Sequence, residues 1–176
     1  MTALPAGIAA VAVPLVLLGS AAGHAARPDA LASALRAQGV LPAGLSRPLA
    51  VLVTAVEAAA GACVAAAALR ALDGTFRASS LASALLLALY ALYAAYVART
   101  RSGVPCGCSG GIGAPMTGWI AVRAAALAAL ALTGAARGLP GGTSGYEAPV
   151  IVTAGLGFAV ILWTLPYAMI EERSPG

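Results

Sequence analysis

The chain has 176 residues, of which 61% are hydrophobic and 9% are charged, and its mean hydropathy is +0.93. A soluble domain carries about 25% charged residues, so this composition excludes an ordinary soluble protein. The net charge of +4 could indicate nucleic-acid binding, but every basic residue is Arg and most lie at the ends of apolar runs. This pattern is typical of helices that cross a lipid bilayer, and we expect no nucleic-acid partner.

Five apolar runs reach roughly the 20 residues that a helix needs to cross a bilayer. They cover residues 6–22, 49–69, 81–98, 117–135 and 150–170. The first run has no basic residue before it, unlike a signal peptide, so we expect a retained helix. Ser79 and Ser80 are expected to cap the third run. Because the runs leave no room for a soluble domain, the whole chain, 1–176, is predicted to be all-α. We expect one polytopic membrane helical bundle, with a four-helix core plus a fifth C-terminal transmembrane helix.

A short amphipathic segment follows the first run. Asp29 can cap a helix that ends at about Gln38, with Leu31 and Leu35 on one side. Such a helix is expected to lie along the membrane interface.

The polar loop at 102–115 separates the third and fourth runs and contains Pro105-Cys106-Gly107-Cys108; we call it the CGC loop. Cysteines at i and i+2 have Cα atoms roughly 6–7 Å apart when extended, near the upper end of disulfide geometry. A bridge between them would close a very small ring, and strained, exposed disulfides tend to be labile or catalytic. The spacing therefore favours a redox loop with Cys106 and Cys108 as candidate catalytic residues.

The third cysteine, Cys63, stands alone among alanines in the second run. A lone cysteine in such a setting is usually a small buried hydrophobe, and this is our interpretation of Cys63. The alternative is a third redox thiol.

Two ionisable residues lie deep inside apolar runs. Glu57 is about 12 Å along the second run, and Arg123 is roughly 10 Å along the fourth, from the helical rise per residue. The loops that precede these two runs must lie on the same side of the membrane, so the two residues have similar depth. Each is expected to be the other's partner. His24, the single histidine, is expected at the membrane edge near this pair.

Aromatic and basic residues gather at the end of the third run. Tyr93 and Tyr96 share one side with Tyr90, and Arg99 follows. An interfacial aromatic belt is the first interpretation, with Trp119 near the interface of the next run. A hydroxyl-lined pocket beside the thiols is the second. Arg99 could lower the pKa of a thiol in the CGC loop by favouring the thiolate.

The sequence resembles the MauE family of methylamine-utilisation membrane proteins, allied to DoxX-like redox-associated membrane proteins. The resembling pieces run in family order over about the first 135 residues: Gly23-His24 with Arg27-Pro28, Gln38-Gly39-Val40-Leu41-Pro42, Val56-Glu57 with Gly61, Pro105-Cys106-Gly107-Cys108, and Trp119 with Arg123. Family members usually have a basic residue where His24 stands and an aromatic residue where Ser109 stands. The fifth run lies outside the resembling region.

This resemblance implies a role in maturing disulfide-containing extracytoplasmic proteins, of the methylamine dehydrogenase small-subunit type. The implied partners are a thioredoxin-like protein and its disulfide-containing client. The implied activity is that of a thiol–disulfide oxidoreductase in the bacterial cytoplasmic (inner) membrane, which passes reducing or oxidising equivalents through the CGC loop. The sequence indicates no certain cofactor, and a quinone is compatible with it.

Three other classes of function stay open at this point. A metal site would have one CxC pair and one histidine, short of the usual structural zinc set, so we expect none. The chain could be a non-catalytic accessory subunit with a structural disulfide. It could also be a small transporter with Glu57 and Arg123 on a polar path.

The arginines bear on membrane orientation. Arg27, Arg36, Arg47, Arg99, Arg101 and Arg173 fall on the side of the CGC loop, and Arg70, Arg77 and Arg137 fall on the other. The positive-inside rule favours a cytoplasmic CGC loop. The family role requires an extracytoplasmic loop, where disulfides persist. We follow the resemblance and expect the loop outside.

Overall fold

The computed structural model describes residues 4–107, 115–139, 141 and 147–171, with side chains for all of these except 43 and 165–171. The described residues form these helices: α1 (Leu4–Ala26), α2 (Pro28–Gln38), the 3-10 helix η1 (Ala43–Leu45), α3 (Ser46–Leu69), α4 (Asp73–Thr100), α5 (Gly118–Arg137) and α6 (Glu147–Glu171). Five of them, all except α2 and η1, are long and apolar enough to cross a membrane. The predicted all-α membrane bundle is confirmed.

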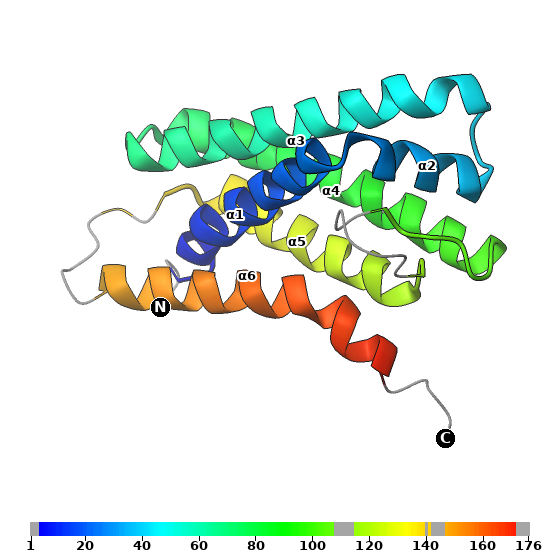
Figure 1. Cartoon of the computed structure of the whole chain (residues 1–176). Helices are drawn as coiled ribbons and strands as arrows, with labels where there is room; N and C mark the ends of the chain where they lie inside the picture. Colours follow the sequence, from blue (N-terminus) through cyan, green and yellow to red (C-terminus); the bar gives the residue numbers. More distant parts are fainter. Residues whose placement is uncertain (1–3, 108–114, 140, 142–146, 172–176) are drawn as a thin grey trace.

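The four-helix unit consists of α1, α3, α4 and α5 (Figure 1). Within it, α1 and α4 each pack against both α3 and α5, so α3 and α5 lie diagonally opposite. α6 packs mainly along the outer side of α1. α2 and the described residues between α4 and α5, 101–107 and 115–117, lie at the same end of the unit. This end holds the candidate site.

α4 begins earlier than predicted, at Asp73 instead of about residue 81. An exposed ion pair stabilises this start, with Arg77 Nε 2.8 Å from Asp73 Oδ2. Arg77 also donates hydrogen bonds to the carbonyl oxygens of Ala136 and Arg137 at the end of α5. Ser79 and Ser80, predicted to cap the third run, therefore lie inside α4. The prediction was wrong because the polar first turns of α4 are held by contacts with α5.

Close approach between helices depends on glycines. A Cβ on Gly61 of α3 would lie 2.9 Å from Leu18 Cγ of α1, and a Cβ on Gly155 of α6 would lie 2.6 Å from Val11 Cβ. Between membrane helices the hydrophobic effect gives little attraction, so van der Waals packing at small residues carries the association. These glycines let α1 touch helices on both of its sides.

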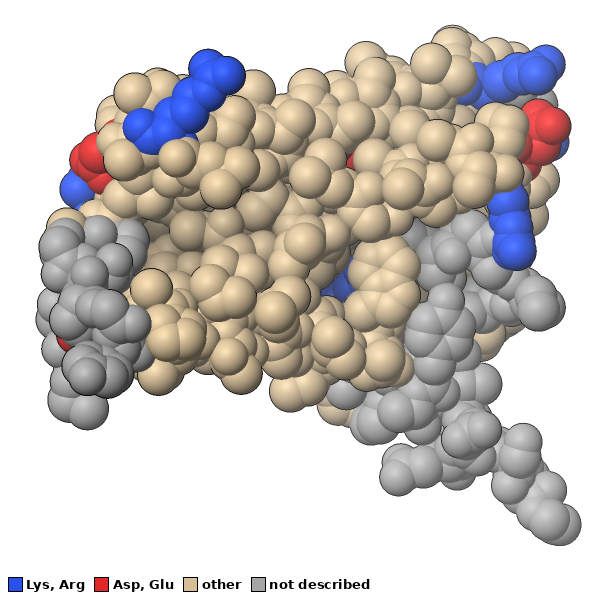
Figure 2. Space-filling model, turned by 60° about the vertical axis from the view of Figure 1, so that its left-hand side comes forward, with Lys and Arg blue, Asp and Glu red and all other residues tan. Residues whose placement is uncertain are grey.

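The outer surface matches a bilayer. Figure 2 shows charged side chains gathered at the two ends of this face, and a belt between them that is uncharged except for one small blue and one small red area. Leu85, Leu89 and Leu92 are exposed on α4, at i, i+4 and i+7, and so share one face of the helix. Soluble monomers rarely expose apolar surfaces of this extent. We conclude that the chain is a multi-pass membrane protein.

The glycine contacts on α6 lead to a matched prediction. Gly155→Ala should lower the melting temperature in detergent because the new Cβ overlaps Val11, and overpacking of this kind costs about 1–3 kcal/mol. Gly157→Ala is the control, since a Cβ there meets nothing within 4 Å. It should be neutral or stabilising, because Ala favours a helix interior over Gly by about 0.5–1 kcal/mol. Equal melting temperatures for the two variants would contradict the described packing of α6 on α1.

Candidate functional site

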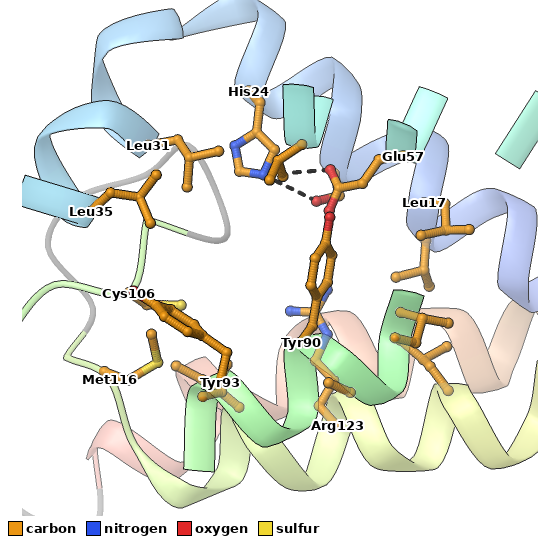
Figure 3. A pocket seen from close by; sticks show the side chains of 18 of the residues that line it. Leu17, His24, Leu31, Leu35, Glu57, Tyr90, Tyr93, Cys106, Met116 and Arg123 are labelled. Carbon is orange, nitrogen blue, oxygen red and sulfur yellow. Dashed lines mark hydrogen bonds and ion pairs between the residues drawn. The ribbon is translucent and has the colours of Figure 1, made fainter. Parts of the chain in front are cut away.

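A cavity of about 150 Å³ lies at the end of the bundle, below α2 (Figure 3). Most of its wall is apolar, with Leu31 and Leu35 from α2, Leu87 from α4 and Leu127 from α5. Seven polar side chains also line it: Ser20, His24, Gln38, Glu57, Tyr90, Tyr93 and Arg123. An apolar cavity with a few convergent polar groups is the usual form of a small-molecule site.

The cavity contains several of the residues singled out in the sequence. His24, Glu57, Tyr93, Cys106 and Arg123 line it. Three others lie elsewhere on exposed positions: Tyr96, Arg99 and Trp119. Cys108 is outside the described residues. Tyr90 and Tyr93 fit the interpretation of a hydroxyl-lined pocket, because they line the cavity. Tyr96 fits the interpretation of an aromatic belt, because it faces outward.

A buried pair joins α1 to α3 at the cavity. His24 Nε2 lies 3.6 Å from Glu57 Oε2, and each residue is 4% exposed. Ser20 Oγ, one turn earlier on α1, is 3.3 Å from the same His24 nitrogen. The dashed lines in Figure 3 mark contacts of this group.

The direct partner of Glu57 in the structure is His24, and the sequence had predicted Arg123. Both Glu57 and Arg123 reach the same cavity, which agrees with their predicted depths. However, α3 and α5 are diagonal in the four-helix unit, so Arg123 enters from the opposite wall. Its guanidinium lies over the ring of Trp163 of α6, 5.3 Å from the centroid. From there its charge still acts on Glu57 through space.

Buried polar atoms without partners surround the cavity. Among the described residues, His24 Nδ1, Glu57 Oε2 and Tyr90 Oη are buried and lack a hydrogen-bond partner. Figure 3 shows the Tyr90 ring directed towards the Glu57 carboxylate. Buried polar groups in proteins are nearly always hydrogen-bonded. The cavity is therefore suited to water or to the polar atoms of a ligand.

Gln38 holds the CGC loop against the bundle. Its Nε2 donates to the carbonyl oxygen of Pro105 at 2.9 Å and, more weakly, to that of Cys106 at 3.4 Å. Its Oε1 accepts a 2.6 Å hydrogen bond from the Tyr93 hydroxyl. The side chain is 1% exposed, so this one amide joins α2, α4 and the loop in a buried setting.

The base of the CGC loop is closed by a backbone pairing. Pro105 and Pro115 form an isolated antiparallel bridge, and Met116 N donates to Val104 O at 2.8 Å. Gly107 has a φ of +72°, and a Cβ there would lie 2.7 Å from Ala34 Cβ of α2. Only glycine meets both requirements without strain.

The two described cysteines have different surroundings. Cys106 is 5% exposed in the cavity wall and is disulfide-bonded. Cys63 is an exposed free thiol, so the prediction of a buried Cys63 was wrong. It lies on the outward side of α3, because Gly61 and Val64 take the buried side.

Sequence reasoning missed Gln38 and Ser20 as site residues, and it named Tyr90 only within its second interpretation of the tyrosines, the hydroxyl-lined pocket. Gln38 follows Leu31 and Leu35 at helical spacing, which places it on the buried side of α2. That side packs against the bundle, so the expectation that α2 simply lies along the interface was incomplete. Ser20 and Tyr90 are one helical turn before His24 and Tyr93, which would have been the signal for each.

The described residues contain no group of three or more His, Cys, Asp or Glu side chains that could hold a metal ion. The chemically active groups that line the cavity are the disulfide-bonded sulfur of Cys106, hydroxyls, an imidazole, a carboxylate and a guanidinium.

Comparison with known proteins places this chain in a family. The family model described as methylamine utilisation protein MauE matches residues 2–137. This match covers α1 to α5 and every residue that lines the cavity, and it leaves α6 outside. No curated protein and no solved structure matches the chain.

The buried pair can be tested by a double-mutant cycle. His24→Leu and Glu57→Leu should each lower the melting temperature, because removing one partner of a buried pair typically costs about 3–5 kcal/mol. The double variant should recover much of that loss. A parallel cycle with Arg123→Leu and Glu57→Leu should show weaker coupling. A larger coupling for Arg123 than for His24 would contradict the described pairing.

The role of Gln38 can be tested by measuring how fast the thiol of Cys106 is alkylated. In a Cys63→Ala/Cys108→Ser background Cys106 is the single thiol, and Gln38→Ala should raise its rate of alkylation several-fold by releasing the loop. The variant should also be less stable, because a buried group left without its partner costs about 1–3 kcal/mol. Ser33→Ala, at an exposed position on the same helix, is the matched control. An unchanged alkylation rate in Gln38→Ala would mean that the loop is held by other contacts.

Proposed function

This chain belongs to the MauE family of methylamine utilisation proteins, and on that premise we propose that it is a membrane thiol–disulfide redox protein. The observation that carries the proposal is the position of Cys106, a disulfide sulfur in the wall of a polar-lined cavity. Gln38 and the bridge between Pro105 and Pro115 hold the loop in place. A purely structural disulfide would not need a cavity with unpartnered polar atoms beside it.

The proposed redox pair is Cys106 with Cys108. The chain has three cysteines and Cys63 is free, so Cys108 is the remaining candidate partner. A thiolate of the partner protein attacks one sulfur of the disulfide, forms a mixed disulfide and releases the other sulfur as a thiolate. The second thiol of the partner then attacks the mixed disulfide. The partner leaves oxidised and the CGC loop is left with two thiols, or the same steps run in reverse.

The two cysteines are proposed to have different roles. Because Cys106 is buried against the cavity, a folded partner has poor access to it, and we assign the contact with the partner to Cys108. The proposed partner is a thioredoxin-like protein that serves a disulfide-containing client, of the methylamine dehydrogenase small-subunit type. The proposed location is the bacterial cytoplasmic membrane with the CGC loop outside, where disulfides persist.

Trapping experiments test these assignments. In Cys106→Ser, Cys108 is first converted to its mixed disulfide with thionitrobenzoate. A thioredoxin whose resolving cysteine is replaced by serine should then displace thionitrobenzoate and accumulate as a mixed disulfide with Cys108, because neither protein has a second thiol nearby to resolve it. Cys108→Ser should trap far less, and both variants should lose turnover. Cys63→Ala is the control and should behave like the wild type. In a Cys63→Ala/Cys106→Ser variant, where Cys108 is the single thiol, an impermeant maleimide applied to intact cells reports the side of the loop.

Two results would refute the proposal. One is normal turnover in Cys106→Ser, and the other is a loss in Cys63→Ala as large as that in Cys106→Ser.

A further inference from the structure

A thiol–disulfide protein in a membrane needs a source or an acceptor of electrons. This chain has enough cysteines for one dithiol pair. Its third cysteine, Cys63, is an exposed free thiol on the outer side of α3 and does not line the cavity. Three cysteines cannot form two disulfides, so electrons cannot pass through a second internal pair. Electrons therefore have to pass between the CGC loop and another molecule.

We propose that the cavity binds the ring of a lipid-soluble quinone, which exchanges two electrons and two protons with the Cys106–Cys108 pair. This inference rests on the proposed function and names its co-reactant by chemical class. The site lies among helices that are long and apolar enough to cross a membrane, where a lipid-soluble carrier would be found.

The size and the walls of the cavity fit such a ring. Its volume is about 150 Å³, and an apolar cavity of about 150 Å³ is known to hold a benzene molecule. Leu31 and Leu35 cover one side, and Leu87 and Leu127 lie on the helices across from them. Cys106 and Met116 complete the wall at the loop end. A ring in this space would lie next to the redox-active sulfur.

The polar groups favour a quinone over a lipid tail. A quinone oxygen accepts hydrogen bonds, and the hydroxyl of the reduced form also donates one. The cavity offers both kinds of partner, because the Arg123 guanidinium only donates, the Glu57 carboxylate only accepts when ionised, and the Tyr90 hydroxyl does either. Glu57 is 4% exposed, and its Oε2 lies 3.6 Å from His24 Nε2 but makes no hydrogen bond within the described residues, and the Tyr90 hydroxyl makes none either. An acyl chain could make no hydrogen bond to these atoms, whereas a quinone oxygen could accept one from the Tyr90 hydroxyl and a quinol hydroxyl could donate one to the Glu57 carboxylate.

The exchange balances without a further reactant. When the loop is oxidised, two S–H bonds break and one S–S bond forms. The two electrons and two protons pass to the two carbonyl oxygens of the quinone and give the quinol. In the opposite direction the quinol reduces the disulfide. His24 and Glu57, 3.6 Å apart, are the cavity groups that can hold and release the protons.

The test uses the purified full-length protein with its loop reduced, under anaerobic conditions. The probes are decylubiquinone and dimethylnaphthoquinone, whose quinone rings have no open position for thiol addition. The wild type should lose two thiols for each quinone reduced with at least one probe, and the active probe identifies a benzoquinone or a naphthoquinone. If neither probe oxidises the loop and neither quinol reduces it, the proposal is wrong and the cavity holds water only.

Variants on α5 locate the site. Leu127→Trp fills the cavity and should lose the quinone reaction. Leu132→Trp is the same change at an exposed position of the same helix, and it should react like the wild type. If Leu127→Trp fails to fold, Ala124→Leu fills the cavity by a smaller amount and should slow the reaction. An unimpaired quinone reaction in the folded cavity-filling variant would overturn the assignment of the site.

A parallel assay with thioredoxin separates the two proposals. Exchange with thioredoxin in the absence of any quinone reaction leaves the proposed function in place and removes the quinone site. A quinone reaction without thioredoxin exchange removes the proposed function and leaves the quinone site.

Discussion

The amide of Gln38 is the contact on which the arrangement of the site depends. It is buried between α2, α4 and the CGC loop, and both of its ends are satisfied, by Pro105 O on one side and the Tyr93 hydroxyl on the other. Irregular backbone among membrane-length helices is tolerated only where its polar groups find partners in the protein. Gly39 follows in the left-handed conformation, with φ +62°, so the chain turns away as soon as the amide is in place. The amide adds hydrogen bonds to the apolar packing of Cys106 with Ala94 and Val97 and of α2 with the Tyr93 ring.

The order of helices in the bundle explains why a cavity exists at all. Glu57 and Arg123 lie on α3 and α5, which are diagonal, so their side chains enter from opposite walls and leave space between them. His24, on the neighbouring α1, takes the place beside the carboxylate. Further from the loop the helices come closer together, where Gly61 approaches Leu17 and Leu18 of α1. The same fold therefore closes one end of the bundle and keeps the other end open for polar groups.

Much of this could be predicted from the sequence, and the exceptions have physical reasons. Apolar runs fix the number of long helices, and the rise per residue places Glu57 and Arg123 at one depth. Depth does not determine which helices are neighbours, so the partner of Glu57 was predicted incorrectly. Cys63 was misplaced because an alanine-rich helix gives no sign of its buried side. Gln38 was missed as a site residue because a single amide carries no motif, although its spacing from Leu31 and Leu35 puts it on the buried side of α2.

The sixth helix lies outside the family match, yet it reaches the site. Trp163 of α6 has its ring 5.3 Å from the Arg123 guanidinium, a distance at which a cation is attracted to the ring face. A Cβ on Gly19 of α1 would lie 3.2 Å from the same indole, so glycine at this position leaves room for the ring to pack closely on α1. The indole thus packs on a guanidinium that lines the cavity. In this chain α6 helps to determine where the positive charge of Arg123 lies at the cavity. Removing α6 would change the surroundings of Arg123 as well as the outer surface of the bundle.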